Sequence, residues 1–204
     1  MEGYVLNSIR VYLVDDHDIV RRGLYDLLAA KRDITVVGDS GSAAVAVRRV
    51  PDLRPDVMVV DLRLQDGSGI QVCRQVRSVD PTIHALLVTS ASDDEALFSA
   101  LLAGASGYAS KLIESSRILE KVRSVGAGRN LIESIPAERT RAALIAAGES
   151  GALGLTDGEL ELLRHVLEGL TNREIADLVQ RPEEAVASEI ALVIETVMGW
   201  QGLA

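Results

Sequence analysis

The sequence contains a single cysteine, Cys73, among 204 residues. One thiol excludes an internal disulfide and any metal site built from several cysteines. Cys73 stands at helical spacing from Ile70 and Val76, which indicates a small buried apolar side chain. His84 and His165 have no companions at the spacing of metal ligands, so no zinc site is predicted.

Long hydrophobic runs are also missing from the chain. No segment approaches the roughly 20 consecutive apolar residues that cross a membrane, and the N-terminus lacks a cationic stretch followed by a long apolar run. The apolar fraction is nevertheless 48%, enough for a sizeable core. We therefore expect a soluble, cytoplasmic protein with no membrane partner. A length of 204 residues favours two small domains, because single cores usually comprise about 100 to 150 residues.

Positive charge is scarce in the C-terminal part. From residue 155 onward the chain has three basic and ten acidic residues, a net charge of −7 out of −9 for the whole sequence. The preceding 154 residues hold the other 18 basic and 20 acidic side chains, so they are nearly balanced. An acidic segment repels the phosphates of nucleic acids, which argues against strong electrostatic binding to DNA.

Residues 9–127 alternate between short apolar runs and amphipathic segments. The apolar runs have the length of strands and occupy 9–14, 34–37, 57–60, 85–88 and 107–109. The other segments have the helical spacing of apolar residues and occupy 17–28, 43–50 up to Pro51, the part from the 67–69 turn to 76, 93–102 and 116–125. Such segments suit the crossovers of a parallel sheet, so we predict an α/β fold with a five-stranded, parallel, doubly wound sheet.

Five polar residues follow four of these apolar runs. They are Asp15, Asp16, Asp61, Thr89 and Lys111. Because the carboxyl ends of parallel strands meet along one edge, these side chains would converge. Three carboxylates there raise one another's pKa unless a cation compensates them, and oxygen ligands of this kind suit Mg²⁺. Each residue alone could be an ordinary cap or turn residue, but all five together predict a pocket for a metal ion and a phosphoryl group.

Several stretches resemble the receiver domain of bacterial two-component response regulators, namely LVDDH, VVDLRLQDGSG, LLVTSAS and GASGYASK. The whole chain is similar to the NarL/FixJ type. Within that type, HDIVRRGL, RPDVMVVDLRL and AGASGY resemble the dormancy-survival (DevR-like) regulators of actinobacteria. The resemblance implies a flavodoxin-like receiver with the strand order 2-1-3-4-5.

The resemblance also implies a role for each acidic residue. Asp61 would be the phospho-acceptor, phosphorylated by a sensor histidine kinase with Mg²⁺ as the cofactor. Asp15 and Asp16 would hold the metal, together with Asp61 and the backbone carbonyl of Arg63. His17, beside the acidic pair, is expected to be a helix-start residue at the rim of the pocket rather than a metal ligand.

The remaining pocket residues would sense the phosphoryl group. Thr89 and Lys111 would contact it, and Thr89 with Tyr108 would form the switch that moves with phosphorylation. A half-buried tyrosine with its hydroxyl in water is the alternative for Tyr108. No pair of nucleophile and base appears outside this pocket, so we expect a protein that accepts a phosphoryl group and loses it to water, and not an enzyme.

The composition changes after residue 128. Pro136 is expected to open a short helix that reaches 147, and residues 148–151 are expected to be a flexible hinge. We therefore assign residues 1–128 to the receiver domain, 129–154 to a linker with a short helix, and 155–204 to an output domain.

The output segment shows three helix starts. Thr156 with Glu159, and Thr171 with Glu174, have the spacing of capping boxes. Pro182 suits the first turn of a third helix. Three short helices predict a small all-α bundle with a helix-turn-helix. The stretch LTDGELELLRHVLEGLTNREIADLV resembles the LuxR-type DNA-binding domain.

The expected DNA-reading helix is degenerate. LuxR-type domains carry lysine and arginine on this helix, whereas this chain has alanine, serine and glutamate there. The candidate DNA contacts that remain are Arg173, Arg181 and Ser188. Too few cations are left for strong counterion release on DNA.

Two functions therefore stay open. The first is a phosphorylation-controlled transcription factor that binds promoter DNA weakly or through a partner, as a homodimer or as a heterodimer with a related regulator. The second is a receiver-controlled protein-interaction module whose helix-turn-helix no longer binds DNA by itself. In that case an apolar surface would replace the DNA-reading face, formed by Ala187, Ala191, Leu192 and Trp200.

Overall fold

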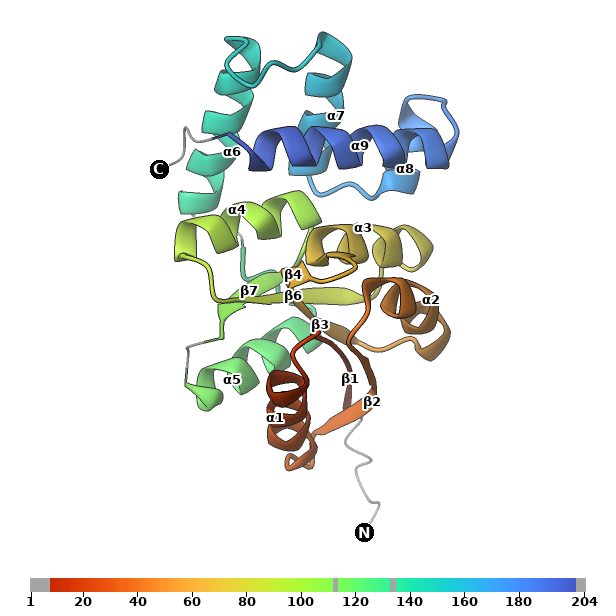
Figure 1. The fold of residues 1–204 in the computed structure, drawn as a ribbon, viewed down its shortest axis with the longest axis vertical. Coiled ribbons are helices and arrows are strands. Elements are labelled where there is room, and N and C mark those ends of the chain that lie inside the picture. Colours follow the sequence, from red (N-terminus) through yellow and green to blue (C-terminus); the bar gives the residue numbers. More distant parts are fainter. Residues whose placement is uncertain (1–7, 112–113, 133–134, 201–204) are drawn as a thin grey trace.

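The computed structural model describes residues 8–111, 114–132 and 135–200. Its centre is a parallel five-stranded sheet with the order β2-β1-β3-β6-β7 (Figure 1). The strands are β1 (Ile9–Val14), β2 (Ile34–Ser40), β3 (Val57–Asp61), β6 (His84–Thr89) and β7 (Gly107–Ser110). The predicted fold class and the strand order 2-1-3-4-5 are confirmed.

Helices cover both faces of the sheet (Figure 1). One face carries α1 (Asp18–Ala29) and α5 (Ser115–Gly126), and the other carries α2 (Ala43–Leu53), α3 (Gly69–Val79) and α4 (Asp93–Ala103). A sheet that is buried on both faces needs continuous apolar strands. Accordingly, every residue of β3 is buried.

Some elements run further than their apolar patterns predicted. β3 and β6 include Asp61 and Thr89 as their last residues, which places both side chains at the edge of the sheet. The expectation that the second helix ends at Pro51 is wrong, because α2 continues to Leu53. Pro51 removes only one helical hydrogen bond near the end of α2. Arg54 closes the helix in a left-handed conformation, with φ 43°.

Within residues 135–200, the structure has four helices. They are α6 (Ile135–Glu149), α7 (Asp157–Leu167), α8 (Asn172–Leu178) and α9 (Glu183–Met198). Both predicted capping boxes, Thr156 with Glu159 and Thr171 with Glu174, are present. Pro182 is the N-cap of α9 and not a residue of its first turn. Within the described ranges, no helix is long and apolar enough to cross a membrane.

Gly148 has a packing role in place of the predicted hinge role. It lies inside α6, which continues to Glu149, so the flexible segment does not begin at residue 148. A Cβ atom on Gly148 would lie 2.3 Å from Cδ1 of Leu160 in α7. The missing side chain therefore lets two helices approach closely, and the local pattern of small residues could not distinguish this role from flexibility.

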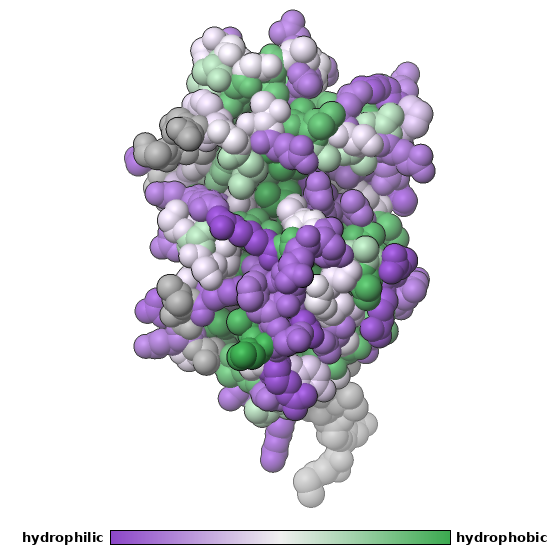
Figure 2. Space-filling view, viewed as in Figure 1, coloured by the Kyte–Doolittle hydropathy of each residue, from purple (hydrophilic) through white to green (hydrophobic). Residues whose placement is uncertain are grey.

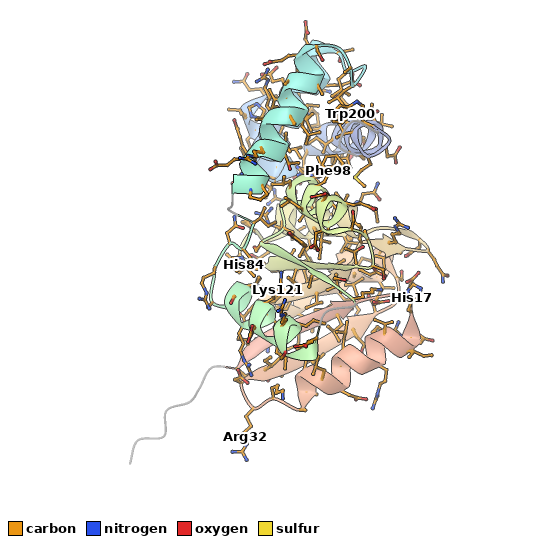
Figure 3. The ribbon with its side chains drawn as sticks, turned by 90° about the vertical axis from the view of Figure 1, so that its left-hand side faces the viewer. His17, Arg32, His84, Phe98, Lys121 and Trp200 are labelled. Carbon is orange, nitrogen blue, oxygen red and sulfur yellow. The ribbon has the colours of Figure 1, made fainter. Side chains whose placement is uncertain are left out.

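The C-terminal helices stack on α3 and α4, and one hydrophobic core continues from the sheet through α4 into α9 (Figure 1). Phe98 of α4 belongs to this core, and Trp200, after α9, packs against it (Figure 3). Two further small strands, β4 (Arg63–Leu64) and β5 (Gly67–Ser68), form a separate antiparallel pair before α3.

A buried arginine joins the α/β part to the C-terminal helices. Arg74 of α3 is 4% exposed and donates to Oδ1 of Asn172 at 2.8 Å. It also donates to the carbonyl oxygens of Leu102 and Leu170, each at 3.2 Å. The backbone N–H of Asn172 in turn donates to Oγ of Ser78 at 3.0 Å. Burial lowers the pKa of Arg74 to about 9. A desolvated charge without its acceptors is costly, so these bonds hold α8 in one position on α3.

A pair of glycine substitutions tests the packing of α3 on β3. A Cβ atom on Gly69 would lie 2.3 Å from the carbonyl oxygen of Asp61, and this backbone atom has little freedom to move. We expect Gly69→Ala to lower the free energy of unfolding by about 1–3 kcal/mol. Gly23 in α1 has no neighbouring atom within 4 Å. Gly23→Ala should therefore raise the free energy of unfolding by up to about 1 kcal/mol. Urea denaturation followed by circular dichroism measures both, and equal midpoints would contradict this account.

Candidate functional site

The carboxyl ends of the central strands surround a pocket at one edge of the sheet. The cavity has a volume of about 250 Å³. It is lined by His17, Asp61, Arg63, Thr89, Ser90, Ala91 and Lys111. Asp15 and Asp16 adjoin this set through their contacts with Lys111 and His17. The structure thus brings together all five polar residues predicted from the strand ends.

Lys111 compensates two buried carboxylates. Its Nζ lies 2.7 Å from Oδ2 of Asp15 and 2.6 Å from Oδ2 of Asp61, and both aspartates are at most 5% exposed. Burial raises the pKa of Asp61, while the hydrogen bond and charge of Lys111 oppose this change. Burial also works against the charge of Lys111, but its hydrogen bonds to Asp15 and Asp61 prevail and raise the pKa of the lysine. The pocket therefore keeps a cation beside the carboxylate of Asp61.

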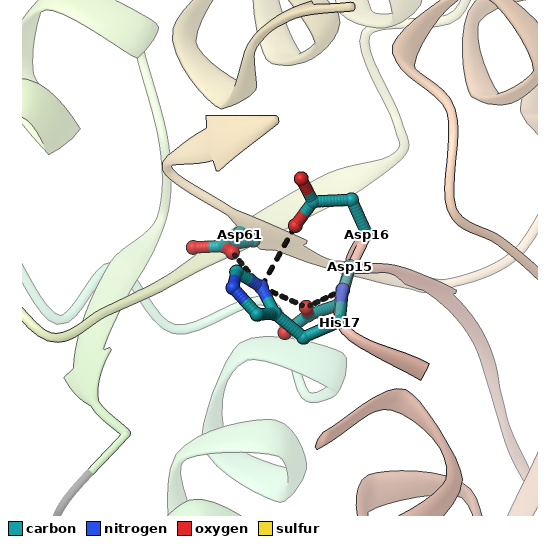
Figure 4. Close-up of side chains that lie close together, drawn as sticks. All are labelled: Asp15, Asp16, His17 and Asp61. Carbon is teal, nitrogen blue, oxygen red and sulfur yellow. Dashed lines mark hydrogen bonds and ion pairs between the residues drawn. The ribbon is translucent and has the colours of Figure 1, made fainter. Parts of the chain in front are cut away.

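Asp15, Asp16, His17 and Asp61 form a compact group (Figure 4). Each offers one possible ligand atom, and these atoms lie within 4.8 Å of one another. Nδ1 of His17 is 2.8 Å from Oδ1 of Asp16 and 3.7 Å from Oδ2 of Asp61. His17 is the N-cap of α1 and its side chain is 64% exposed, as expected for a residue at the rim. The contact of its ring with the acidic group was not predicted, and its place next to two aspartates was the only signal.

Backbone amides complete the pocket. The N–H of Gln65 donates to Oδ2 of Asp16 at 3.0 Å, and the N–H of Arg63 donates to Oδ1 of Asp61 at 3.4 Å. The N–H of Ala91 donates to Oγ1 of Thr89 at 3.0 Å. Sequence reasoning missed these donors because every residue other than proline has a backbone N–H, so their positions depend on the path of the loops.

Tyr108 lies on β7, beside the strand that ends in Thr89. In the register of β6 and β7, Leu87 is opposite Tyr108 and Thr89 is opposite Ser110. The tyrosine is half-buried, and burial raises the pKa of its hydroxyl. Lys121 donates to its carbonyl oxygen at 2.7 Å and lies 5.0 Å from the centre of its ring. The partial burial of Tyr108 agrees with the alternative of a half-buried tyrosine, and it is also compatible with a side chain that moves as a switch.

Each of the three candidate DNA contacts already has a hydrogen-bond or ion-pair partner in α9. Nε of Arg173 lies 3.2 Å from Oε2 of Glu183, and Nη1 of Arg181 lies 2.8 Å from Oε2 of Glu189. The hydroxyl of Ser188 donates to a backbone carbonyl one turn earlier in its own helix, at 2.8 Å. Hydrophilic side chains predominate, with some apolar ones among them, at the end of the molecule where α8 meets α9 (Figure 2). The exposed cations of this segment are thus neutralised by neighbouring glutamates.

The predicted apolar surface on α9 is not a single exposed face, so this prediction is wrong. Ala187 and Ala191 line a cavity of about 130 Å³ against α3, shared with Arg74. Trp200 packs against the hydrophobic core, whereas Leu192 is 59% exposed. Consecutive helical residues point about 100° apart, so Leu192 faces away from the side that Ala191 presents to α3.

Comparisons with known proteins identify relatives of this chain. Residues 11–123 match the family described as the response regulator receiver domain. The chain is 46% identical over 188 residues to the DNA-binding transcriptional activator DevR/DosR of Mycobacterium tuberculosis, covering 91% of this chain and 87% of that protein. It is 36% identical over 175 residues to the transcriptional regulatory protein LiaR of Bacillus subtilis, covering 83% of this chain and 81% of that protein.

Solved structures share the fold. A two-component response regulator of the LuxR family from Aurantimonas sp. is 32% identical with a TM-score of 0.58, over 60% of this chain and 88% of that one. The response regulator ChrA of a heme-sensing two-component system is 27% identical with a TM-score of 0.52, over 93% of this chain and 90% of that one. The chain therefore belongs to the response regulator family of two-component systems.

Proposed function

We propose that this protein is a phosphorylation-controlled regulator of transcription, with Asp61 as the phospho-acceptor and a sensor histidine kinase as its partner. The observation that carries the proposal is the position of Asp61. Its carboxylate lies at the end of β3, opens on the pocket and has the Lys111 ammonium 2.6 Å away. The relatives named as transcriptional regulators support the output.

In the proposed transfer, one carboxylate oxygen of Asp61 attacks the phosphorus of a phosphohistidine. A phosphorus–oxygen bond forms, the phosphorus–nitrogen bond breaks, and the electron pair leaves with the imidazole. Positioning and charge neutralisation provide most of the catalysis in such transfers. Lys111 and Thr89 would contact the oxygens of the phosphoryl group, because both line the cavity beside Asp61.

The residues at the pocket fit Mg²⁺. Carboxylate oxygens of Asp15, Asp16 and Asp61 lie within 4.8 Å of one another, which is the oxygen-rich donor set that this ion prefers. The backbone carbonyl of Arg63 would be a further ligand. When bound, the ion would offset the negative charge that gathers between the phosphoryl group and the carboxylates.

Switching would follow from the same geometry. If the phosphoryl group attracts the hydroxyl of Thr89, the hydrogen bond that this hydroxyl now accepts from the N–H of Ala91 would break. Tyr108 on the adjacent strand would move into the space that Thr89 vacates and alter the surface of α4 and β7. Such a packing element has two states and a local charge biases them. Attack of water on the acyl phosphate would reset the state, so autodephosphorylation would be the protein's only hydrolytic step.

We also propose the division into a receiver domain (1–128), a linker (129–154) and a LuxR-type output domain (155–204). The capped helices α7 and α8 and the following α9 support the last segment as a helix-turn-helix unit. The linker holds the whole of α6, which packs on α4 and α7.

For the output, promoter binding through a homodimer or a heterodimer remains one candidate. A second candidate is an interaction module that does not bind DNA alone. The ion pairs of Arg173 with Glu183 and of Arg181 with Glu189 favour the second candidate. Arg164 is paired with Glu149 as well, so all three arginines of this segment are already neutralised. Its interaction surface would have to lie elsewhere than on Ala187 and Ala191, which face α3.

The phospho-acceptor is tested by labelling with a small-molecule phosphodonor in Mg²⁺. Asp61→Asn should abolish labelling, because the amide is not a nucleophile. Asp52 is exposed on α2, so Asp52→Asn should label like the unmodified protein and serves as the matched control. Intact mass spectrometry measures the added phosphoryl group. Unchanged labelling of Asp61→Asn would show that another residue is the acceptor.

Metal binding is tested by thermal unfolding with and without Mg²⁺. At a concentration about 100 times its dissociation constant, the ion should stabilise the protein by about 2.7 kcal/mol. Asp16→Asn should remove most of this shift because it removes a negative ligand, while Asp52→Asn should keep it. A shift of equal size in both variants would point to non-specific binding.

DNA binding is tested by fluorescence anisotropy with random duplex DNA. At physiological salt we expect a dissociation constant of about 10⁻⁴ M or larger, which is the upper limit of ordinary non-specific binding. The reason is the net charge of −7 on the output segment. The double variant Glu183→Gln, Glu189→Gln should bind more tightly, since it releases Arg173 and Arg181. Sub-micromolar binding by the unmodified protein with a steep salt dependence would refute the second candidate.

A further inference from the structure

A second polar cavity lies where α3, the end of α4, α6 and the α7–α8 loop meet. Its volume is about 310 Å³, and its lining includes two arginines, Arg77 of α3 and Arg141 of α6. Gly104 and Gly169, both in left-handed conformations with φ of 61° and 88°, also line it. The cavity is therefore built by the α/β part, the segment after it and the C-terminal helices together.

Arg77 has no hydrogen bond or ion pair with any residue in the described ranges. The carboxylate that acts on its charge is Glu174. That carboxylate is engaged elsewhere, since it accepts from the N–H of Thr171 at 2.7 Å and from the hydroxyl of Thr171 at 2.8 Å. Burial lowers the pKa of Arg77. A guanidinium keeps its proton in proteins, so Arg77 is a charged group with unused donors.

The position of Arg77 depends on a glycine. A Cβ atom on Gly104 would lie 2.4 Å from Nη1 of Arg77, so the guanidinium lies over the bare backbone at the end of α4. Gly104 also takes a conformation that other residues rarely adopt. The backbone thus leaves room for the guanidinium at the wall of the cavity.

Arg141, His84 and Glu168 are the other titratable side chains that line the cavity. Nε of Arg141 donates to the carbonyl oxygen of Leu167 at 3.1 Å, and its other nitrogens have no partner among the described residues. Nδ1 of His84 is 3.1 Å from Oγ of Ser106, and burial lowers the pKa of His84, which favours the neutral ring (Figure 3). The carboxylate that lines the cavity, Glu168, belongs to an exposed side chain that lies near His165.

We propose that this cavity is a binding site for a small oxyanion of phosphate chemistry, held between Arg77 and Arg141. Two guanidinium groups with unused donors match the oxygens of a phosphate or of a phosphomonoester. The site is separate from Asp61 and does not depend on phosphorylation. Because its walls come from both parts of the chain, a bound anion would stabilise the docked position of the C-terminal helices.

The test uses the full chain without Mg²⁺, so that the carboxylates near Asp61 repel the probe. Isothermal titration with inorganic phosphate, against sodium chloride at equal ionic strength, should show saturable binding at one site. Arg77→Gln and Arg141→Gln should each weaken binding by about tenfold, the usual loss for a hydrogen bond to a charged group. Arg48 is exposed on α2, and Arg48→Gln should leave the affinity unchanged.

A parallel titration with glycerol phosphate distinguishes the two sources of the anion. Tighter binding of the ester would identify a phosphorylated metabolite, and tighter binding of phosphate would identify the free ion. Absence of saturable binding, or equal affinity in Arg77→Gln and the unmodified protein, would overturn the proposal. Labelling of Asp61 by a phosphodonor checks that each variant is folded, and it stays informative about the proposed function if the anion site fails.

Discussion

The ion pairs of Lys111 with Asp15 and Asp61 are the interaction on which the rest of the site depends. Two carboxylates that are nearly inaccessible to water repel each other unless a cation lies beside them. One ammonium within 2.7 Å of both resolves this conflict. Lys111 also connects the carboxyl ends of β1 and β3 to the residue that follows β7. The same ion pairs thus stabilise the carboxylate of Asp61 and hold this edge of the sheet together.

The pocket and the C-terminal helices are joined through α4. This helix begins four residues after Thr89, and the carbonyl oxygen of Leu102 near its end accepts a hydrogen bond from Arg74. The hydrophobic core is continuous across the boundary. Close-packed interiors change by discrete repacking and not by gradual deformation. A shift of α4 would therefore act on the contact between Arg74 and Asn172, which holds α8.

Arginines at the α8–α9 end of the molecule differ in their partners from those at the boundary between the α/β part and the C-terminal helices. Within α8 and α9, Arg173 and Arg181 are paired with glutamates, so this end offers little attraction for phosphates. Arginines with unused donors lie instead at the boundary, where Arg77 and Arg141 line one cavity. The groups suited to binding an anion therefore lie at the contact of the C-terminal helices with the rest of the protein, and not on the surface of α8 and α9.

The sequence by itself determined the sheet, its order by family resemblance, the capping boxes and the group of residues at the strand ends. These features depend on local periodicity and on the rule that parallel strands end at one edge. The tertiary structure alone decided the bonds of Arg74 with Asn172, the packing role of Gly148, and the direction in which Ala187 faces. Each of these contacts joins different helices, and no local pattern records which surface of another helix a side chain will meet.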